Sequence, residues 1–311
     1  MTLPDFFDSK KSSNLYGVLD KFNFLRELYQ KNKFPNVLML SGKKGSGKST
    51  LVNHLMFYFF DKDNYNLPTN EISKKTVFYN QFTNDIFSNI IYLLGSDFKN
   101  TKIEDIRNLK KKIFKSSILN MSRYIILDDV ELFNNNSLNA LLKIIEEPTI
   151  SNYFILINNE SKPVIETIKS RCLEIKIILS EKQRLNTIKS LIKKHSVNSI
   201  IDPISTHLSP GNYLKFNYIL NEKNISLDDD FLKNLGILLN LYKKEKDIIY
   251  IDMILFLTDN YFNNLKNNNS SINAKVIEHK SFVFENINKF FLYNLNQNAL
   301  LNTINSKINN E

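Results

Sequence analysis

The chain has 311 residues, of which 42% are hydrophobic and 23% charged, which predicts a globular protein of two or three domains and excludes peptide hormones and disulfide-rich miniproteins. One cysteine, Cys172, excludes a disulfide framework and a multi-cysteine zinc site, and no apolar run approaches the ~20 residues of a membrane span. The net charge of +9 comes mostly from lysine, which fits a codon bias toward A and T and is weak support for nucleic-acid binding. The N-terminus has no secretory signal pattern, so we expect a cytoplasmic protein.

The first half of the chain alternates helical and strand patterns. Residues 15–34 have the apolar spacing of an amphipathic helix, and Val37–Leu40 is a short apolar run typical of a buried parallel strand. The next expected elements are a helix over 49–60, loops over 62–75, a strand over 77–82, a helix over 101–117, a strand over 123–128, a helix from its cap Ser137 to Ile145 that stops at Pro148, and a strand over 154–157. This alternation predicts an α/β domain with a parallel sheet over residues 1–178.

Beyond residue 178 the chain reads as helical. Helices are expected over 181–194, 211–220, 228–243 and parts of 247–265 and 276–308, with an Asn/Lys-rich loop over 264–273. The simplest division is a small helical domain over 179–225 and a larger helical domain over 226–311.

A phosphate-binding motif follows the first strand. The segment from Gly42 to Ser49 fits the pattern G-x-x-x-x-G-K-[ST], and it lies between a predicted strand and a predicted helix, which disfavours an accidental glycine-rich turn. In such a loop the backbone N–H groups wrap phosphate, Lys48 reaches the β and γ oxygens, and Ser49 can ligate Mg²⁺. We therefore predict an ATP site formed by Gly42, Lys43, Lys44, Gly45, Ser46, Gly47, Lys48, Ser49 and Thr50.

The second half of that site is predicted at the end of the strand over 123–128. Asp128 is the natural metal-side carboxylate and, with Ser49, the expected magnesium ligand. Asp129 stands where an ATPase of this type usually has the glutamate that orients water. Aspartate is one methylene shorter, and a misplacement of about 1 Å can cost ~10²-fold in rate. Nucleotide binding is thus better supported than hydrolysis.

Two further segments resemble signatures of clamp-loader AAA+ proteins. They are Asn139-Ala-Leu-Leu-Lys-Ile-Ile-Glu-Glu-Pro148 and Ser170-Arg171-Cys172, and the segment over 101–107 is also similar to the family. The resemblance covers about residues 35–178 and is closest to the delta-prime subunits of bacterial DNA polymerase III. The Asp128-Asp129 pair, in place of Asp-Glu, favours delta-prime over the gamma/tau motor subunit. The resemblance implies a P-loop AAA+ domain, a helical lid and a C-terminal collar domain for oligomerisation.

The resemblance also implies roles for two residues. Arg171 corresponds to an arginine that acts in trans, as a finger that completes the ATP site of a neighbouring subunit. A planar guanidinium suits that role better than lysine does, and Arg171 is one of five arginines, at positions 26, 107, 123, 171 and 184. An ordinary surface ion pair is the alternative. Asn159 corresponds to the sensor of the γ-phosphate or water, and a turn residue is the alternative.

Three departures from the family pattern bear on activity. Residues 51–127 contain no cysteine, so the zinc module that many clamp loaders carry is not predicted. Ser209-Pro-Gly-Asn212 resembles the second-sensor region but has no arginine, which together with Asp129 indicates poor hydrolysis by this chain alone. Cys172 is interpreted as a small packed side chain without a redox role.

The family resemblance implies a component of the DNA polymerase III holoenzyme. The implied partners are delta and gamma/tau subunits, the sliding clamp and primed DNA, and the implied cofactors are ATP and Mg²⁺. Two alternatives stay open at this point: an active motor ATPase of gamma/tau type, and a basic DNA-binding module.

Overall fold

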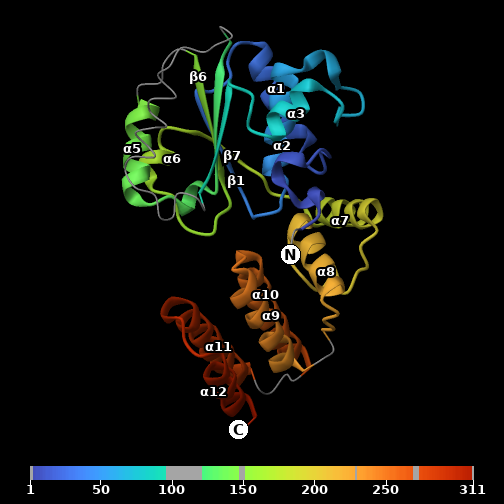
Figure 1. Cartoon of the computed structure of the whole chain (residues 1–311), viewed down its shortest axis with the longest axis vertical. Coiled ribbons are helices and arrows are strands. Elements are labelled where there is room, and N and C mark those ends of the chain that lie inside the picture. Colours follow the sequence, from blue (N-terminus) through green and yellow to red (C-terminus); the bar gives the residue numbers. More distant parts are fainter. Residues whose placement is uncertain (1–2, 96–120, 147–150, 228–229, 269–272, 310–311) are drawn as a thin grey trace. The chain divides into compact units, whose positions relative to one another are not determined.

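The computed structural model describes residues 3–95, 121–146, 151–227, 230–268 and 273–309 (Figure 1). The chain divides into two compact units, the first comprising Thr2–Leu191 with Ser209–Asn212 and the second Ile192–Leu208 with Tyr213–Glu311. Helices α7 (Glu181–His195) and α8 (Pro210–Glu222) each have residues in both units. The segment over 179–225 that the sequence predicts as a lid therefore contributes to both.

The first unit is built on a five-stranded sheet whose neighbouring strands are all parallel. Its strands have the order β4-β5-β6-β1-β7, with β1 spanning Val37–Ser41, β4 Ile90–Leu94, β5 Arg123–Asp128, β6 Asn152–Asn158 and β7 Leu173–Lys176. Every residue of β1 and β5 is buried, which is why Val37–Leu40 and the interior of β5 (124–127) are continuous apolar runs. The predicted α/β domain with a parallel sheet is confirmed.

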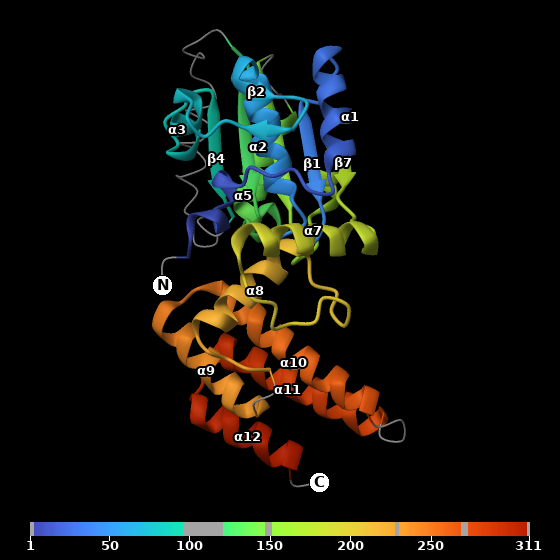
Figure 2. The same cartoon turned by 90° about the vertical axis from the view of Figure 1, so that its right-hand side faces the viewer.

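Helices cover both faces of this sheet (Figure 1). On one face Leu38 and Leu40 pack with α1 (Leu19–Gln30), α2 (Lys48–Phe60) and α3 (Val77–Thr83), and Figure 2 shows α2 between the other two. On the other face Met39 packs with α5 (Asn135–Glu146) and α6 (Glu166–Lys169). This alternation of side chains along β1 follows from the two-residue period of a strand.

The segment over 77–82 is the helix α3, so the predicted strand there is wrong. Val77, Phe78 and Tyr79 have strand propensity, but the Thr76 hydroxyl accepts a hydrogen bond from Tyr79 N at 3.0 Å and caps a helix. Phe78 and Phe82, four residues apart, both lie in the core. Their spacing puts them on one helical face.

Other expected elements need correction at their ends. The helix predicted over 15–34 begins only at Leu19, because Gly17 has a φ of 73° that a helix cannot include. Ser137 is not the cap of α5, since Asn134 Oδ1 accepts from Ser137 N at 2.8 Å. The predicted loop over 62–75 contains a small antiparallel pair, β2 (Tyr65–Asn66) with β3 (Glu71–Ile72).

Strand β4 was not predicted from the sequence. The predicted helix over 101–117 and its stretch at 101–107, as well as Pro148, lie outside the described residues.

Helices make up the described part of the second unit beyond residue 230 (Figure 1). They are α9 (Phe231–Glu245), α10 (Ile248–Asn268), α11 (Asn273–Tyr293) and α12 (Gln297–Asn309), and α12 returns to pack on α9. Asp230 caps α9 by accepting from Lys233 N at 2.9 Å, so this helix starts later than predicted. In the described part of the chain, no helix has both the length and the apolar character needed to span a bilayer.

Candidate functional site

The parallel topology brings the predicted phosphate site together at one edge of the sheet. The loop from Gly42 follows the carboxyl end of β1, Asp128 ends β5, and Asn159 directly follows β6. These strands are neighbours, and Gly42 N donates to Asn158 O at 3.1 Å. We call this the carboxyl edge of the sheet, the usual place of ligand sites in open parallel sheets.

The loop itself depends on glycines. Gly45 and Gly47 have φ values of 80° and 97°, in the left-handed region that favours glycine. Gly47 is also the N-cap of α2, so the first N–H groups of this helix point toward the loop. The loop therefore presents a helix N-terminus, which favours an anionic ligand.

Lys48 lies beneath this loop with only 3% of its surface exposed. Its ammonium donates to Gly42 O and, at 2.9 Å, to Lys43 O. Burial lowers the pKa of Lys48 to about 8, partly offset by the negative charges of Asp128 and Glu131. The buried Ser46 hydroxyl has no hydrogen-bond partner among the described residues. A buried cation and a buried hydroxyl without a partner, both from this segment, fit phosphate oxygens.

Asp128 has both carboxylate oxygens engaged. Oδ1 accepts from Asp129 N at 2.9 Å, and Oδ2 accepts from the hydroxyls of Tyr92 and, at 3.5 Å, of Ser49. Burial raises the pKa of Asp128, while the Tyr92 hydrogen bond opposes that rise. A hydroxyl and a carboxylate oxygen are ligands that Mg²⁺ takes in proteins, so Ser49 and Asp128, 3.5 Å apart, would hold this ion.

Asp129 and Asn159 contact one another. Asn159 Nδ2 donates to Asp129 Oδ1 at 2.6 Å, and Asp129 has a left-handed φ of 54°, which aspartate tolerates better than most residues. The structure thus joins the predicted water-orienting residue to the predicted sensor. Their carboxylate and amide are fixed as a pair at the carboxyl edge.

Glu131 is a residue of this edge that the sequence analysis missed. It is buried and accepts from Asn159 N at 3.1 Å and from the Ser161 hydroxyl at 2.9 Å. Glu131 therefore anchors the turn that carries Asn159. The only signal in the sequence is a third acidic residue shortly after Asp128 and Asp129.

The segment Ser209–Asn212 packs directly on the phosphate loop. The Ser209 hydroxyl donates to Lys44 O at 2.5 Å, and Gly211 N donates to Gly45 O at 2.9 Å. A Cβ on Gly211 would lie 2.8 Å from Gly45 Cα, so the two backbones meet without intervening side chains. The segment that resembles a second-sensor region therefore contacts the phosphate loop.

The remaining loop residues complete this edge. Lys43 and Lys44 are exposed, whereas Thr50 is buried with its hydroxyl 2.6 Å from that of Ser12. The predicted residues that lie at or next to the carboxyl edge are Gly42, Lys43, Lys44, Gly45, Ser46, Gly47, Lys48, Ser49, Thr50, Asp128, Asp129 and Asn159.

Arg171 lies elsewhere. It precedes β7, whose Leu173 pairs with Leu38 near the start of β1, so it lies at the opposite, amino edge of the sheet. The length of β1, about 15 Å, separates the two edges. The Arg171 guanidinium bonds to Glu146 Oε1 at 2.7 Å and Thr167 O at 2.8 Å, and its side chain is 38% exposed.

Cys172, next to Arg171, is half-buried. Its thiol contacts Ile168 O at 3.0 Å. Burial, helped by the Glu174 charge, raises the pKa of Cys172 to about 12. The reactive thiolate is therefore scarce at neutral pH, in agreement with a packing role.

Comparison with known proteins identifies the family of this chain. A family model described as DNA polymerase III, delta subunit, matches residues 19–181, just over half of the 311-residue chain. The chain belongs to this family. It is a clamp-loader family protein and is delta-prime-like, as the relatives below also indicate.

Curated relatives of this clamp-loader protein carry three subunit names. The delta-prime subunit of Buchnera aphidicola subsp. Schizaphis graminum is 30% identical over 201 residues, 61% of this chain and 60% of the relative. The gamma subunit of Buchnera aphidicola subsp. Acyrthosiphon pisum is 24% identical over 221 residues, 70% of this chain and 60% of the relative. The tau subunit of Bacillus subtilis is 29% identical over 151 residues, 48% of this chain and 25% of the relative. The chain thus spans less than two thirds of each of these relatives.

Among solved structures, a DNA polymerase III gamma subunit-related protein from Thermotoga maritima is similar, with a TM-score of 0.45 and 15% identity. The match covers 90% of this clamp-loader protein and 96% of that chain.

Proposed function

We propose that this clamp-loader protein acts as a delta-prime subunit that binds MgATP at the carboxyl edge and donates Arg171 to the ATP site of a neighbouring gamma/tau-type subunit. Lys48 and the α2 N-terminus would hold the phosphates, and Ser49 and Asp128 would hold Mg²⁺. When bound, that ion neutralises phosphate charge. The wider partners in the proposal are the delta subunit, the sliding clamp and primed DNA.

The position of Arg171 carries the proposal. The register of β7 on β1 puts it at the amino edge, about 15 Å of strand away from this chain's own phosphate loop. A half-exposed guanidinium there is available to a phosphate held by another subunit. Its fork geometry suits the charge that develops in phosphoryl transfer.

Poor hydrolysis by this chain alone is part of the proposal. Asp129 is shorter than the usual glutamate, and its Oδ1 already accepts a hydrogen bond from Asn159 at 2.6 Å. A carboxylate held in this way has less freedom to orient water. Misplacement on the ångström scale costs ~10²-fold in rate.

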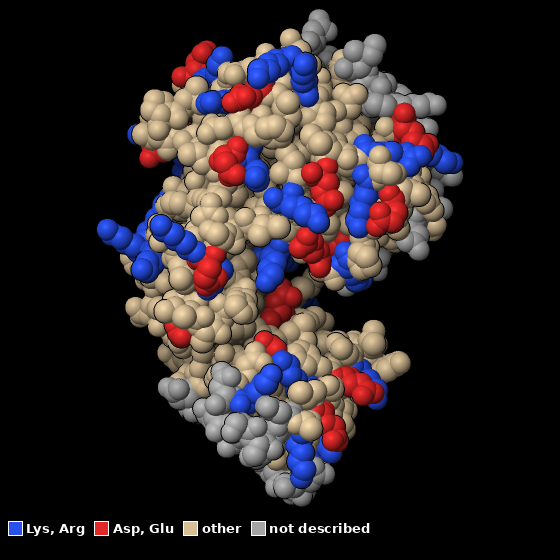
Figure 3. Space-filling model, turned by 180° about the vertical axis from the view of Figure 1, so that it is seen from behind, with Lys and Arg blue, Asp and Glu red and all other residues tan. Residues whose placement is uncertain are grey.

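The basic DNA-binding alternative has less support. On the face shown in Figure 3, Lys and Arg side chains are interspersed with Asp and Glu. Phosphate backbones favour a continuous basic surface. If the isolated protein bound DNA with a steep dependence on salt, the alternative would gain weight.

The test is reconstitution with candidate delta and gamma/tau subunits, followed by ATPase measurement with and without primed DNA. We expect the chain to co-purify with them, and Arg171→Ala to lower ATPase of the complex by ~10³-fold, the lower end for an arginine finger. Nucleotide binding by the isolated Arg171→Ala chain should match wild type. Arg171→Lys is the matched control for charge alone, and we expect it to restore little of the activity.

The active gamma/tau-type motor remains the second candidate because relatives of both names match the chain to a similar extent. It is distinguished by ATP turnover of the purified chain. Robust hydrolysis without partners would contradict the delta-prime proposal. Hydrolysis that appears only in the complex, and that Arg171→Ala abolishes, supports it.

A further inference from the structure

Tyr92 is placed to act on the metal-side carboxylate. It lies on β4, which pairs with β5 so that Tyr92 is level with Ile126, and its hydroxyl donates to Asp128 Oδ2. The same oxygen faces the Ser49 hydroxyl. With Asp129 N on Oδ1, the Tyr92 bond fixes the second oxygen and thereby the orientation of the carboxylate.

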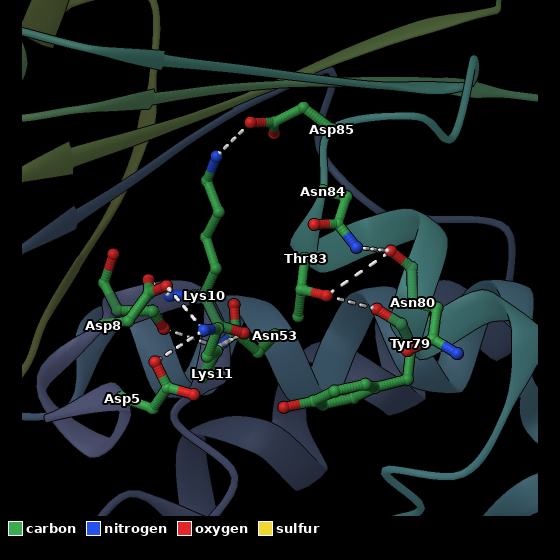
Figure 4. Close-up of polar contacts among 11 residues, drawn as sticks. Asp5, Asp8, Lys10, Lys11, Asn53, Tyr79, Asn80, Thr83, Asn84 and Asp85 are labelled. Carbon is green, nitrogen blue, oxygen red and sulfur yellow. Dashed lines mark hydrogen bonds and ion pairs between the residues drawn. The ribbon is translucent and has the colours of Figure 1, made fainter.

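The N-terminal segment holds Tyr92 in turn. We call Ser9–Ser12 the strap; it includes the short 3-10 helix η2 (Ser9–Lys11). The Lys10 ammonium lies 4.6 Å from the centroid of the Tyr92 ring. Figure 4 shows the Lys10 side chain extending from the strap to Asp85, 2.5 Å from its carboxylate. Lys10 therefore has a fixed position over the ring.

The strap is also tied to the phosphate-loop helix. Asn53 on α2 is buried, and its Nδ2 donates to Ser9 O at 2.8 Å and Ser12 O at 3.0 Å. One turn earlier, the Thr50 hydroxyl lies 2.6 Å from that of Ser12. The strap thus joins the helix that carries Ser49 to the tyrosine that contacts Asp128.

We propose that Tyr92, held by the strap, is a positioning residue that orients Asp128 for Mg²⁺ at the nucleotide site. The inference rests on the proposed function, because it takes that site as a MgATP site. Residues that hydrogen-bond a metal-ligating carboxylate fix its direction, and their loss typically lowers metal affinity ~10–100-fold. The hydroxyl of Tyr92 is such a group, and the strap limits its motion.

The experiment measures binding of a fluorescent ATP analogue to the full chain across a Mg²⁺ titration and in EDTA. Tyr92→Phe removes only the hydroxyl, and we expect it to raise the Mg²⁺ concentration at half-effect by ~10-fold or more. Affinity in EDTA should stay within about twofold of wild type, because the ring still packs. Tyr79→Phe, on the neighbouring α3, is the matched control and should leave both quantities unchanged.

A second variant tests the strap. Lys10→Met removes the ammonium over the ring and should shift the Mg²⁺ midpoint in the same direction, by about threefold. If the strap acts through Tyr92, the double variant should show no shift beyond that of Tyr92→Phe, since coupled residues are not additive. Lys10→Met also keeps the inference testable should Tyr92→Phe prove unstable in thermal denaturation.

Three outcomes would overturn the inference. They are an unchanged or lowered Mg²⁺ midpoint in Tyr92→Phe, equal losses of affinity with Mg²⁺ and in EDTA, and fully additive effects of the two substitutions. A wild-type chain that binds the nucleotide analogue at no Mg²⁺ concentration contradicts the proposed function itself and removes both. The two failures are thus distinguishable.

Discussion

The two edges of the sheet differ in how their charged residues are held. At the carboxyl edge Lys48 is 3% exposed and Asp128 and Glu131 are each 6% exposed, and all three are hydrogen-bonded. At the amino edge the Arg171 and Glu146 side chains are 38% and 45% exposed. A buried, fully partnered cluster is preorganised for one ligand, whereas an exposed ion pair can exchange its partner.

The free energy needed to break a contact therefore differs between the two edges of the sheet. An exposed ion pair contributes ~0–1 kcal/mol, so the bond of Arg171 to Glu146 can be broken at small cost, as the proposed role of Arg171 requires. Breaking a buried hydrogen bond to a charged group costs more, ~1–3 kcal/mol. Changes at the carboxyl edge should therefore affect the stability and ligand binding of the chain itself, whereas changes at the amino edge should affect them little.

The largest effect is expected from Lys48→Ala. Loss of the buried ammonium removes charge-assisted contacts to phosphate worth ~3 kcal/mol, so ATP affinity of the isolated chain should fall about 100-fold. Lys44→Ala, an exposed lysine of the same loop, is the matched control and should change affinity less than about threefold. Isothermal titration of both variants makes the measurement, and equal effects would remove the distinction between buried and exposed lysines.

Glu131→Ala tests the anchor beneath Asn159. The Asn159 N–H and the Ser161 hydroxyl lose their acceptor, which should lower the free energy of unfolding by about 2–3 kcal/mol and Tm by roughly 5–10 °C. Glu166→Ala, an exposed glutamate on α6, should stay within about 0.5 kcal/mol. If the two variants melted alike, the carboxyl edge would not depend on Glu131.

Because of His54 on α2, the free energy of unfolding should decrease at acidic pH. Burial lowers its pKa to about 4, and the unfolded chain has the ordinary value near 6.5. Between these values only the unfolded state takes the proton, so stability falls as pH decreases, by about 2 kcal/mol from pH 6.5 to 5.

The corresponding variant is His54→Phe. In urea titrations its stability should fall less over this pH range than that of wild type, by about the same 2 kcal/mol. His207→Gln, at an exposed site, should keep the wild-type profile. An unchanged loss of stability at acidic pH in His54→Phe would assign the pH dependence to other groups.

The smallest effect is expected at the amino edge. Glu146→Gln removes the charge that pairs with Arg171, and the free energy of unfolding should change by less than about 1 kcal/mol. Thermal denaturation of the isolated chain is sufficient to measure it. A loss above about 2 kcal/mol would mean that Arg171 is tied into the fold, and the contrast between the edges would fail.

The sequence predicted those elements whose apolar pattern directly reflects their burial in the folded chain. The interiors of strands β1, β5 and β6 are apolar runs because both faces of the sheet are covered, and the phosphate motif lies between β1 and α2 as expected. Strand β4 (Ile90–Leu94) lies at the end of the sheet and is half-buried, and its sequence is also a continuous apolar run, so the pattern that indicates it was present but overlooked. In α3 the strand propensity of Val77 and Phe78 outweighed the Thr76 cap signal.

The candidate site was predicted only as far as its motifs reach. Glu131 and Tyr92 carry no motif, and their roles depend on contacts between neighbouring strands and turns. The contact of Asn53 with the strap joins residues more than 40 positions apart. Likewise, the sequence names Arg171, but only the register of β7 on β1 shows at which edge it lies.

The contact of Gly45 with Gly211 limits which side chains these two positions can carry. A methyl group on Gly211 would come within 2.8 Å of Gly45 Cα, and one on Gly45 would come within 2.6 Å of the Ser209 hydroxyl. The constraint therefore concerns size at both positions and not charge or polarity. Any successful replacement at one glycine must be matched by a displacement of the other segment, so the loop and the start of α8 can change only together.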